Sequence, residues 1–354
     1  MANQHATVAR HPDEALGNAA HRSPRVTYIS WAESCSRSDH TARELGGHSH
    51  MVYLPQFGSR PSTVLLKYAG QWVKTRRILR TERPEVVFVM TPPLFAALPA
   101  FWYARRTGAS VVIDAHTAAF LLPRWRRFQW LQRALCRAAA TTLVSNEHLA
   151  GVVQACGAHA TVVPDVPVIF DPRTTFPRPP EFTVAAVCSF DYDEPVEAIF
   201  DAASQLPEVR FFVTGNAKRL SPALKSRIPS NLTLTGFLTT ESYGALLADA
   251  DAALVLTTYD HTMLRGAYEA IYQSTPVIVS DWPLLRDAFP QGAIHVDNSS
   301  AAIVSAVREM ARDHDRYKSG ARLLRETKLR RWDTTRTAIL ARISQRALRQ
   351  DEAC

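Results

Sequence analysis

Glu269 is the residue whose setting first suggests chemistry. It lies early in an apolar helical stretch, AYEAIYQSTPVIVSD at residues 267–281, one turn after the uncharged corner Thr262-Met263-Leu264. The free backbone N–H groups of the first helical turn, helped by the helix dipole, would bind an anion such as a diphosphate. A carboxylate one turn further in can accept two hydrogen bonds from vicinal hydroxyls, such as those of a ribose. An equally weighted alternative is that Glu269 is solvated and only complements the positive end of the helix.

A second pair of chemically useful side chains, Asp114 and His116, lies at the carboxyl end of the predicted strand 110–115. Deprotonating an acceptor hydroxyl requires a carboxylate or an imidazole within hydrogen-bond reach, which makes Asp114 a candidate general base. His116 could steady a bound sugar. The competing interpretation of Asp114 is that it caps the following turn, and this one is favoured over the role of a base. The competing interpretation of His116 is that it is a hydrogen-bonded polar residue without a role in binding, and this one is not favoured.

These side chains must be positioned by strands and helices that alternate along the chain. The residue pattern predicts strands at 25–30, 50–55, 85–90, 110–115 and 141–146, and again at 182–190, 209–216, 231–237, 252–258, 276–281 and 293–298. Such alternation indicates parallel sheets with helices on both faces. Between the two series, residues 162–182 contain six prolines, which predicts an extended connector.

The expected fold class is therefore α/β, with two doubly wound Rossmann-like domains facing each other across a cleft. Ligands of such sheets bind beyond the carboxyl ends of the strands, so the cleft is the expected site. The predicted parts are a disordered tail at 1–24, an N-terminal domain at 25–165, a proline-rich linker at 166–181, a C-terminal domain at 182–331 and a final helix at 332–354.

The charge of the chain points to an anionic partner. The formal net charge is +8, and arginines and lysines gather with Trp, Phe and Leu at 65–80 and 124–137. That composition suits an anionic lipid surface, although a helix that packs on the sheet with its arginines in water is the commoner arrangement. Nucleic acid is the weaker expectation, because no nucleic-acid-binding motif accompanies the charge.

The sequence also predicts a compartment. Five cysteines without paired spacing suggest neither a disulfide framework nor a zinc site, so a reducing compartment is expected. The first 24 residues lack the apolar core of a signal peptide. Residues 86–104 carry no charge, but three prolines interrupt them, which favours a buried strand and helix over a membrane span. The predicted location is cytoplasmic, with peripheral contact at the inner face of the membrane.

Three stretches of the second half resemble one enzyme family. They are GAYEAIYQSTPVIVSD at 266–281, VTGN at 213–216 and NLTLTGFLTTESYGALLADADAALVLT at 231–257. In combination they resemble the nucleotide-sugar-binding elements of GT-B glycosyltransferases of the group 1, family 4-like type. The resemblance extends over roughly residues 25 to 345 and is strongest from 209 to 298.

The resemblance implies roles for residues of both domains. The C-terminal domain would bind the nucleotide sugar, with Glu269 on the donor ribose, and the final helix would cross back to the acceptor-side N-terminal domain. His116 would lie near the donor sugar and the acceptor. The other residues to which it assigns donor binding are Thr262, Met263, Leu264, Arg265, Gly215 and Asn216. The loop after the first strand, with Arg37, Ser38 and Asp39, resembles the acceptor-side loop, although a helix N-cap is the safer interpretation for Ser38 or Asp39.

The sequence departs from the family at two places. The family's first motif glutamate, which contacts the transferred sugar, is replaced by His261. The loop CSFDYDEPVEA at 188–198 is acidic where the family carries Arg and Lys that neutralise the departing diphosphate. Lys218, Arg219 and Arg265 are the candidate substitutes, since positioned cations are usually a large catalytic term for a departing anion.

The sequence thus predicts a hexosyltransferase-like glycosyltransferase that moves a sugar from a nucleotide-sugar donor to a hydroxyl of a saccharide or lipid-linked acceptor, in polysaccharide or glycolipid synthesis. No cofactor is expected. No metal is expected either, because Asp-x-Asp occurs three times in the chain and is too common to mark a site. The alternatives are a nucleotide-sugar epimerase of similar fold and a catalytically silent protein that binds a nucleotide or a partner.

Overall fold

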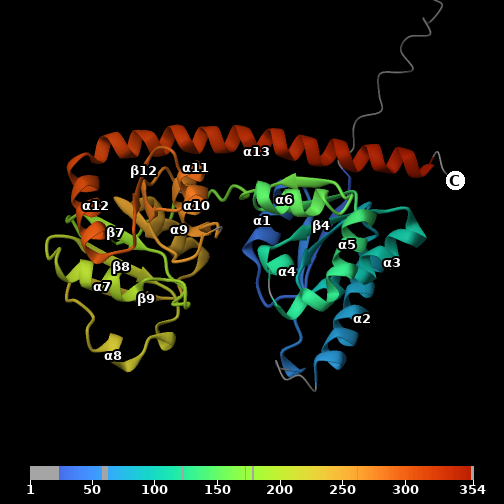
Figure 1. Cartoon of the computed structure of the whole chain (residues 1–354), viewed down its shortest axis with the longest axis horizontal. Helices are drawn as coiled ribbons and strands as arrows, with labels where there is room; N and C mark the ends of the chain where they lie inside the picture. The colour runs from blue at the N-terminus through green and yellow to red at the C-terminus, as the bar shows by residue number, and fades with distance from the viewer. Residues whose placement is uncertain are drawn as a thin grey trace, which may run out of the picture.

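The computed structural model describes residues 24–57, 63–121, 123–171, 173–177, 179–260 and 262–351. The predicted tail, apart from residue 24, and His261 lie outside these ranges. Figure 1 shows two lobes side by side, with one long helix, α13 (His314–Asp351), running across both. Each lobe is built on one six-stranded sheet, and every strand pair in both sheets is parallel.

The sheet of the first lobe has the strand order β2-β1-β3-β4-β5-β6. Its central strands are apolar runs because both faces are covered by helices, as is usual for parallel sheets. The strands are β1 (Val26–Ser30), β2 (His48–Met51), β3 (Val86–Thr91), β4 (Ser110–Ala115), β5 (Thr141–Val144) and β6 (Ala160–Val162). The helices are α1 (Ser36–Glu44), α2 (Val64–Glu82), α3 (Ala97–Thr107), α4 (Thr117–Leu121), α5 (Gln129–Ala138) and α6 (Glu147–Gln154), with 3₁₀ turns η2 (Pro55–Phe57), η4 (Leu94–Ala96) and η5 (Pro123–Phe128).

Two strands of this sheet differ from the sequence prediction. The strand expected at 50–55 lies at His48–Met51, since Pro55 cannot donate to a ladder and instead begins a 3₁₀ turn. The edge strand β6 was not predicted, because its three residues are too few to show a periodic pattern.

The sheet of the second lobe has the order β12-β11-β10-β7-β8-β9. Its strands are β7 (Thr183–Ala186), β8 (Arg210–Thr214), β9 (Leu232–Gly236), β10 (Ala252–Val255), β11 (Val277–Ser280) and β12 (Ala293–Val296). The helices are α7 (Val196–Ser204), α8 (Pro222–Lys225), α9 (Thr240–Asp249), α10 (Arg265–Tyr272), α11 (Pro283–Ala288) and α12 (Ser300–Arg312), and η6 (Ala217–Arg219) is a 3₁₀ turn. Separate apolar clusters fill its two faces, which makes this sheet doubly wound like the first.

Helix α13 joins the two lobes. It begins in the second lobe, where Ala321 and Leu324 enter the core beside α10, and continues without a break into the first. There Trp332, Ile339 and Ile343 complete the apolar cluster on one face of the first sheet. The crossing helix expected from residue 332 is therefore the second half of a longer helix.

The proline-rich connector between the lobes is anchored along its length. Val166 belongs to the apolar cluster of the first lobe, and Phe176 packs on that of the second. Gln273 of the segment after α10 donates from Nε2 to the carbonyl of Val168 at 2.8 Å and accepts from the backbone N–H of Phe170 at 3.2 Å. The connector is thus held by the second lobe before that lobe's first strand begins.

Candidate active site between the lobes

A cavity of about 460 Å³ lies between the two lobes. The first lobe contributes the segment after β1, the end of β4 with the residues that follow it, Ser145 after β5 and the segment after β6, and the second contributes the loop before α10 and its first turn. The first-lobe walls therefore lie at the carboxyl ends of four parallel strands, where ligands of such sheets bind. The candidates that line the cavity are Arg37, Asp114, His116, Thr262, Met263 and Arg265.

Asp114 is held in a buried ion pair. Its Oδ2 atom accepts from Nε of Arg37 at 2.9 Å and from the hydroxyl of Tyr28 at 2.6 Å. Burial alone would raise the pKa of Asp114, but the charge of Arg37, the imidazole of His116 and the two hydrogen bonds lower it below its ordinary value. Asp114 is therefore a carboxylate at neutral pH, and Arg37 orients it.

His116 follows β4 and forms part of the cavity wall. Its backbone N–H donates to the carbonyl of Thr91 at 2.9 Å, which fixes the turn. Burial is the main cause of the lowered pKa of the imidazole; the charge of Asp114 opposes it, and the guanidinium groups of Arg37 and Arg265 add to the lowering. His116 is thus neutral at pH 7, and a neutral imidazole can both accept and donate a hydrogen bond.

Three polar atoms around this cavity are buried and have no hydrogen-bond partner among the described residues. They are Oδ1 of Asp114, Nε2 of His116 and Oδ2 of Asp165. A buried polar atom without a partner costs about 1–3 kcal/mol, so three of them around one cavity indicate a polar ligand that completes their hydrogen bonds.

Arg265 and Glu269 act as a unit at the start of α10. Helix α10 begins tightly against the end of β7, since a Cβ added to Gly266 would lie 2.6 Å from Cγ1 of Val187. Oε1 of Glu269 accepts from Nε of Arg265 at 2.7 Å, and Oε2 accepts from the hydroxyl of Tyr243 at 2.8 Å. Nη2 of Arg265 reaches the first lobe and donates to Oγ of Ser36 at 3.0 Å.

This arrangement places Glu269 behind Arg265. Glu269 is only 7% exposed, and it is not among the described residues that line the cavity. Arg265 lines the cavity and is 29% exposed at its side chain. The carboxylate of Glu269 therefore fixes the guanidinium of Arg265 at the N-terminus of α10, where the helix dipole adds to the positive charge of the guanidinium.

The sequence analysis missed Asp165, which lies just after β6. Burial raises its pKa to about 7, against the lowering effect of Arg265 and Arg37. No periodic pattern surrounds this residue, because it lies among prolines and follows a three-residue strand. The only sequence signal was a carboxylate between two prolines at 164 and 167.

The remaining predicted residues that the structure describes do not line the cavity. Ser38 is buried and shares a hydrogen bond of 2.6 Å with Ser30, while Asp39 accepts from Ser49. Leu264 is the N-cap residue of α10. In the loop after β8, Oδ1 of Asn216 accepts from the backbone N–H of Lys218 at 3.1 Å and Gly215 pairs with Gly236. His261 lies outside the described residues.

In the acidic loop after β7, the carboxylate of Glu194 binds to backbone N–H groups of the loop itself. The carboxylate of Glu194 accepts from the backbone N–H of Ser189 at 2.9 Å and from that of Phe190 at 2.7 Å. Phe190 has a φ of 57°, so successive N–H groups converge on the carboxylate, as in an anion-binding nest. Arg219 pairs with Asp191 at 3.4 Å. The backbone donors of Ser189 and Phe190 are therefore satisfied within the chain.

Comparisons with known proteins show similarity in structure alone. No family model and no curated protein sequence matches the chain. Among solved structures, sucrose-phosphate synthase from Thermosynechococcus elongatus superposes with a TM-score of 0.64 at 12% identity, covering 93% of this chain and 98% of that one. HepE from Anabaena in complex with UDP-glucose gives 0.60 at 12% identity, covering 94% and 100%. The lipopolysaccharide outer core galactosyltransferase WaaB gives 0.53 at 14%, covering 88% and 99%.

These similarities extend over both lobes and nearly the whole length of each compared chain. They agree with the two parallel six-stranded sheets seen here. The fold predicted from the sequence is confirmed, and the chain has the GT-B fold of these glycosyltransferases.

Proposed function

We propose that the protein is a glycosyltransferase that binds a nucleotide sugar in the cleft and transfers the sugar to an acceptor hydroxyl. The observation that carries this proposal is the set of unpartnered polar atoms of Asp114, His116 and Asp165 around one cavity between the lobes. Structural similarity to HepE, solved with UDP-glucose and also with UDP, supports a nucleotide-sugar donor.

On the donor side, Arg265 is the cation that meets the diphosphate. Its guanidinium lies in the first turn of α10, where the helix dipole also favours an anion. Glu269 holds it in place and is itself oriented by the hydroxyl of Tyr243, so the charge of Arg265 needs no rearrangement when the diphosphate departs. Because Glu269 is buried behind Arg265 and does not line the cavity, it contributes chiefly through Arg265.

On the acceptor side, His116 and Asp114 contact hydroxyl groups. The neutral Nε2 of His116 forms a hydrogen bond with a hydroxyl of the sugar. Oδ1 of Asp114 accepts from the acceptor hydroxyl and takes its proton as the new glycosidic bond forms, if the reaction inverts the anomeric centre. Because Arg37 lowers the pKa of Asp114, Asp114 is a weak base. Its main role is to orient the acceptor hydroxyl by accepting a hydrogen bond from it.

The acceptor class proposed is a saccharide or a lipid-linked saccharide, and the transferred group a hexose. A hexosyl acceptor presents several hydroxyls, which suits a cavity wall with separate hydrogen-bonding atoms. The place of such a reaction would be polysaccharide or glycolipid synthesis.

The proposal is tested by thermal shift with UDP-, GDP- and dTDP-sugars. A true donor should raise the melting temperature, and Arg265→Ala should remove most of that rise because the diphosphate loses its cation. The matched control is Arg286→Ala, since Arg286 pairs with Asp281 on the exposed surface of the same lobe. If no nucleotide sugar shifts the wild-type protein, or if Arg265→Ala responds like the control, the proposal fails.

A second candidate function is a catalytically silent nucleotide binder. The observation in its favour is the carboxylate of Glu194, which occupies the backbone donors of the loop after β7. Such a protein would show the thermal shift but would neither transfer nor hydrolyse the sugar. Release of the nucleoside diphosphate in the presence of a mixed set of saccharide acceptors distinguishes the two.

A further inference from the structure

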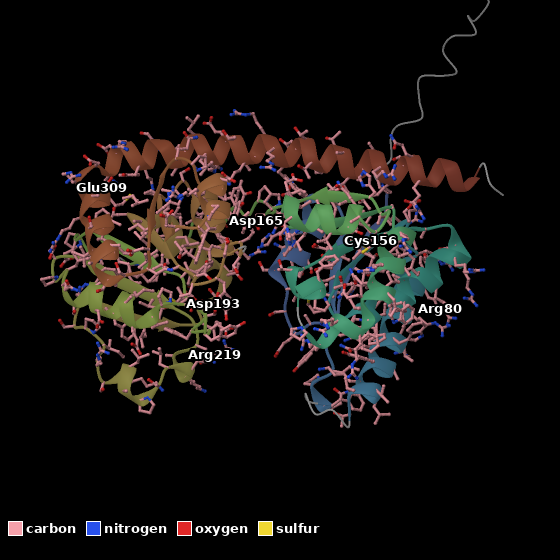
Figure 2. The ribbon with its side chains drawn as sticks, viewed as in Figure 1. Arg80, Cys156, Asp165, Asp193, Arg219 and Glu309 are labelled. Atoms are coloured by element: carbon pink, nitrogen blue, oxygen red, sulfur yellow. The ribbon has the colours of Figure 1, made fainter. Side chains whose placement is uncertain are left out.

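The outer side of the first lobe carries an unusual group of arginines. Figure 1 shows α2 and α3 on the side of this lobe away from the second lobe, and Figure 2 shows Arg80 there. The guanidinium carbon of Arg76 lies 3.9 Å from the centre of the Trp102 ring, that of Arg106 lies 3.7 Å away and that of Arg80 lies 5.9 Å away. Three cations of two helices therefore converge on one indole.

These cations lack neutralising partners within the described parts of the chain. No described carboxylate lies within ion-pair distance of Arg76, Arg80 or Arg106. Nε of Arg76 is buried and has no hydrogen-bond partner. The three residues line a hollow of about 430 Å³ together with Trp102, Tyr103 and Thr107. Contact with the ring offsets only part of the repulsion among the guanidinium groups, so the cluster favours an anion such as phosphate.

The same face of α2 continues as an apolar surface. At helical spacing, Leu65, Leu66, Ala69 and Val73 fall on the face that carries Arg76, Arg77 and Arg80 one to four turns later. Leu65 is 79% exposed, Leu66 61% and Val73 57%. Exposed leucines followed by arginines along one helix face match an element that lies in a lipid interface, with apolar groups among the acyl chains and arginines on phosphates.

We propose that this α2–α3 face binds an anionic lipid bilayer. Arg76, Arg80 and Arg106 hold headgroup phosphates beside Trp102, and Leu65, Leu66 and Val73 enter the boundary between headgroups and acyl chains. Among the described residues, no helix is long and apolar enough to cross a membrane. The second basic segment, 124–137, is less suited, because Trp125 and Phe128 pack against Phe95 inside the lobe.

The test is flotation of the full chain with vesicles of phosphatidylcholine alone and of phosphatidylcholine with phosphatidylglycerol. Binding is expected only to the anionic vesicles and should weaken at high salt. The triple variant Arg76→Gln, Arg80→Gln, Arg106→Gln should bind about 100-fold more weakly, since each basic residue near the surface is worth about a factor of five. The control Arg312→Gln, Arg322→Gln, Arg330→Gln removes the same charge from α12 and α13 and should change binding by less than about threefold.

A second pair of variants tests the apolar half. Leu65→Ser with Leu66→Ser should lower vesicle binding even at high salt, whereas Phe237→Ser with Leu323→Ser, at equally exposed apolar positions elsewhere, should not. Circular dichroism and the melting temperature of the free protein report whether each variant is folded. Absence of wild-type binding, or equal losses in the test and control variants, would overturn the proposal. So would calorimetric binding of soluble glycerol phosphate without any vesicle binding, which would assign the arginines to a soluble phosphate ester.

Discussion

Asp114 and Asp165 line the same cavity, but their partners give them different charge states. Asp114 accepts from Arg37 and Tyr28, and its pKa is lowered. Asp165 has an unpartnered Oδ2, and burial raises its pKa to about 7. Environments that push the pKa values of two carboxyl groups apart are typical of sites that divide proton-accepting and proton-donating roles. The geometry thus assigns the permanent charge to Asp114 and leaves Asp165 able to change its protonation near neutral pH.

The first prediction concerns Asp165→Asn. The folded protein keeps a proton on Asp165 up to about pH 7, whereas the unfolded chain loses it near the ordinary value of 3.8. The stabilisation that this carboxyl provides is therefore complete below about pH 4 and is lost as the pH rises to 7. Urea unfolding should find the variant and the wild type similar at pH 4, with the variant more stable by on the order of 2 kcal/mol at pH 7.5. A difference that stays constant over this range would contradict the assignment.

The second prediction concerns Tyr28→Phe. Removing the buried hydroxyl should lower the free energy of unfolding by about 1–2 kcal/mol, because Asp114 loses a hydrogen bond. It should also raise the pKa of Asp114, so the acid limb of the pH–rate profile should move to higher pH. Tyr103→Phe is the control, since Tyr103 is equally buried but donates to the backbone carbonyl of Pro84. A shift of the acid limb in both variants would argue against a specific effect on Asp114.

The sequence predicted several individual residues of this site but not how they associate. Asp114 and His116 could be chosen because they lie at the carboxyl end of a predicted strand, and Arg37 and Arg265 because their loops resemble those of a known family. The position of Glu269 depends on Tyr243, which belongs to another helix, α9. Thus residue type and local spacing identified the candidates, while long-range packing decided which side chain faces the cavity.

At the scale of elements, apolar runs were the reliable signal. β3 and β4 consist of buried residues throughout and lie within one residue of their predicted bounds. β2 is partly exposed and mostly polar, and its predicted position was wrong by two to four residues. Helix α10 begins at Arg265, directly after the uncharged corner Thr262-Met263-Leu264 that the sequence analysis placed before the helical stretch. Local patterns locate elements whose burial is uniform, and here they failed for the edge strands β2 and β6 of the first sheet.

The third prediction concerns the turn after β8. Gly215 has a φ of 106°, and a Cβ there would lie 2.2 Å from the carbonyl oxygen of Cys188. Gly215→Ala should therefore lower the free energy of unfolding by about 2–4 kcal/mol. Gly151→Ala is the control, because this glycine lies within α6 with open space around its Cα, and it should be neutral or stabilising by up to about 1 kcal/mol. Equal effects at the two positions in chemical denaturation would refute the strain argument.

At the scale of the whole molecule, α13 couples the lobes. Trp332 is buried in the first lobe, and its Nε1 donates to Oε2 of Glu44 at 2.7 Å. Further along, Arg342 and Arg346 donate to the carbonyls of Ala140 and Ala138. The two-domain plan could be predicted from the repeated strand pattern and the proline-rich connector. The full length of α13 was not predicted, although no proline separates its second-lobe half from its first-lobe half.

The fourth prediction concerns Trp332→Ala. Loss of the indole should destabilise the first lobe by about 3–5 kcal/mol, because it leaves a cavity in the cluster beneath α13. Calorimetry should then resolve an earlier transition for that lobe, and amide exchange should speed up in β1 and α1. Leu323→Ala, at a half-exposed position of the same helix within the second lobe, should leave a single transition. A uniform loss of protection over both lobes would show that α13 does not act locally.

The order in which the chain is synthesised gives α13 a further consequence. Trp332, Ile339 and Ile343 belong to the interior of the first lobe, yet the ribosome makes them only after the entire second lobe. Domains generally fold in turn from the N-terminus during translation, but this nascent domain must wait with an open apolar face until α13 emerges. The second lobe can therefore finish folding first, and the first lobe remains a client for chaperones in the interval.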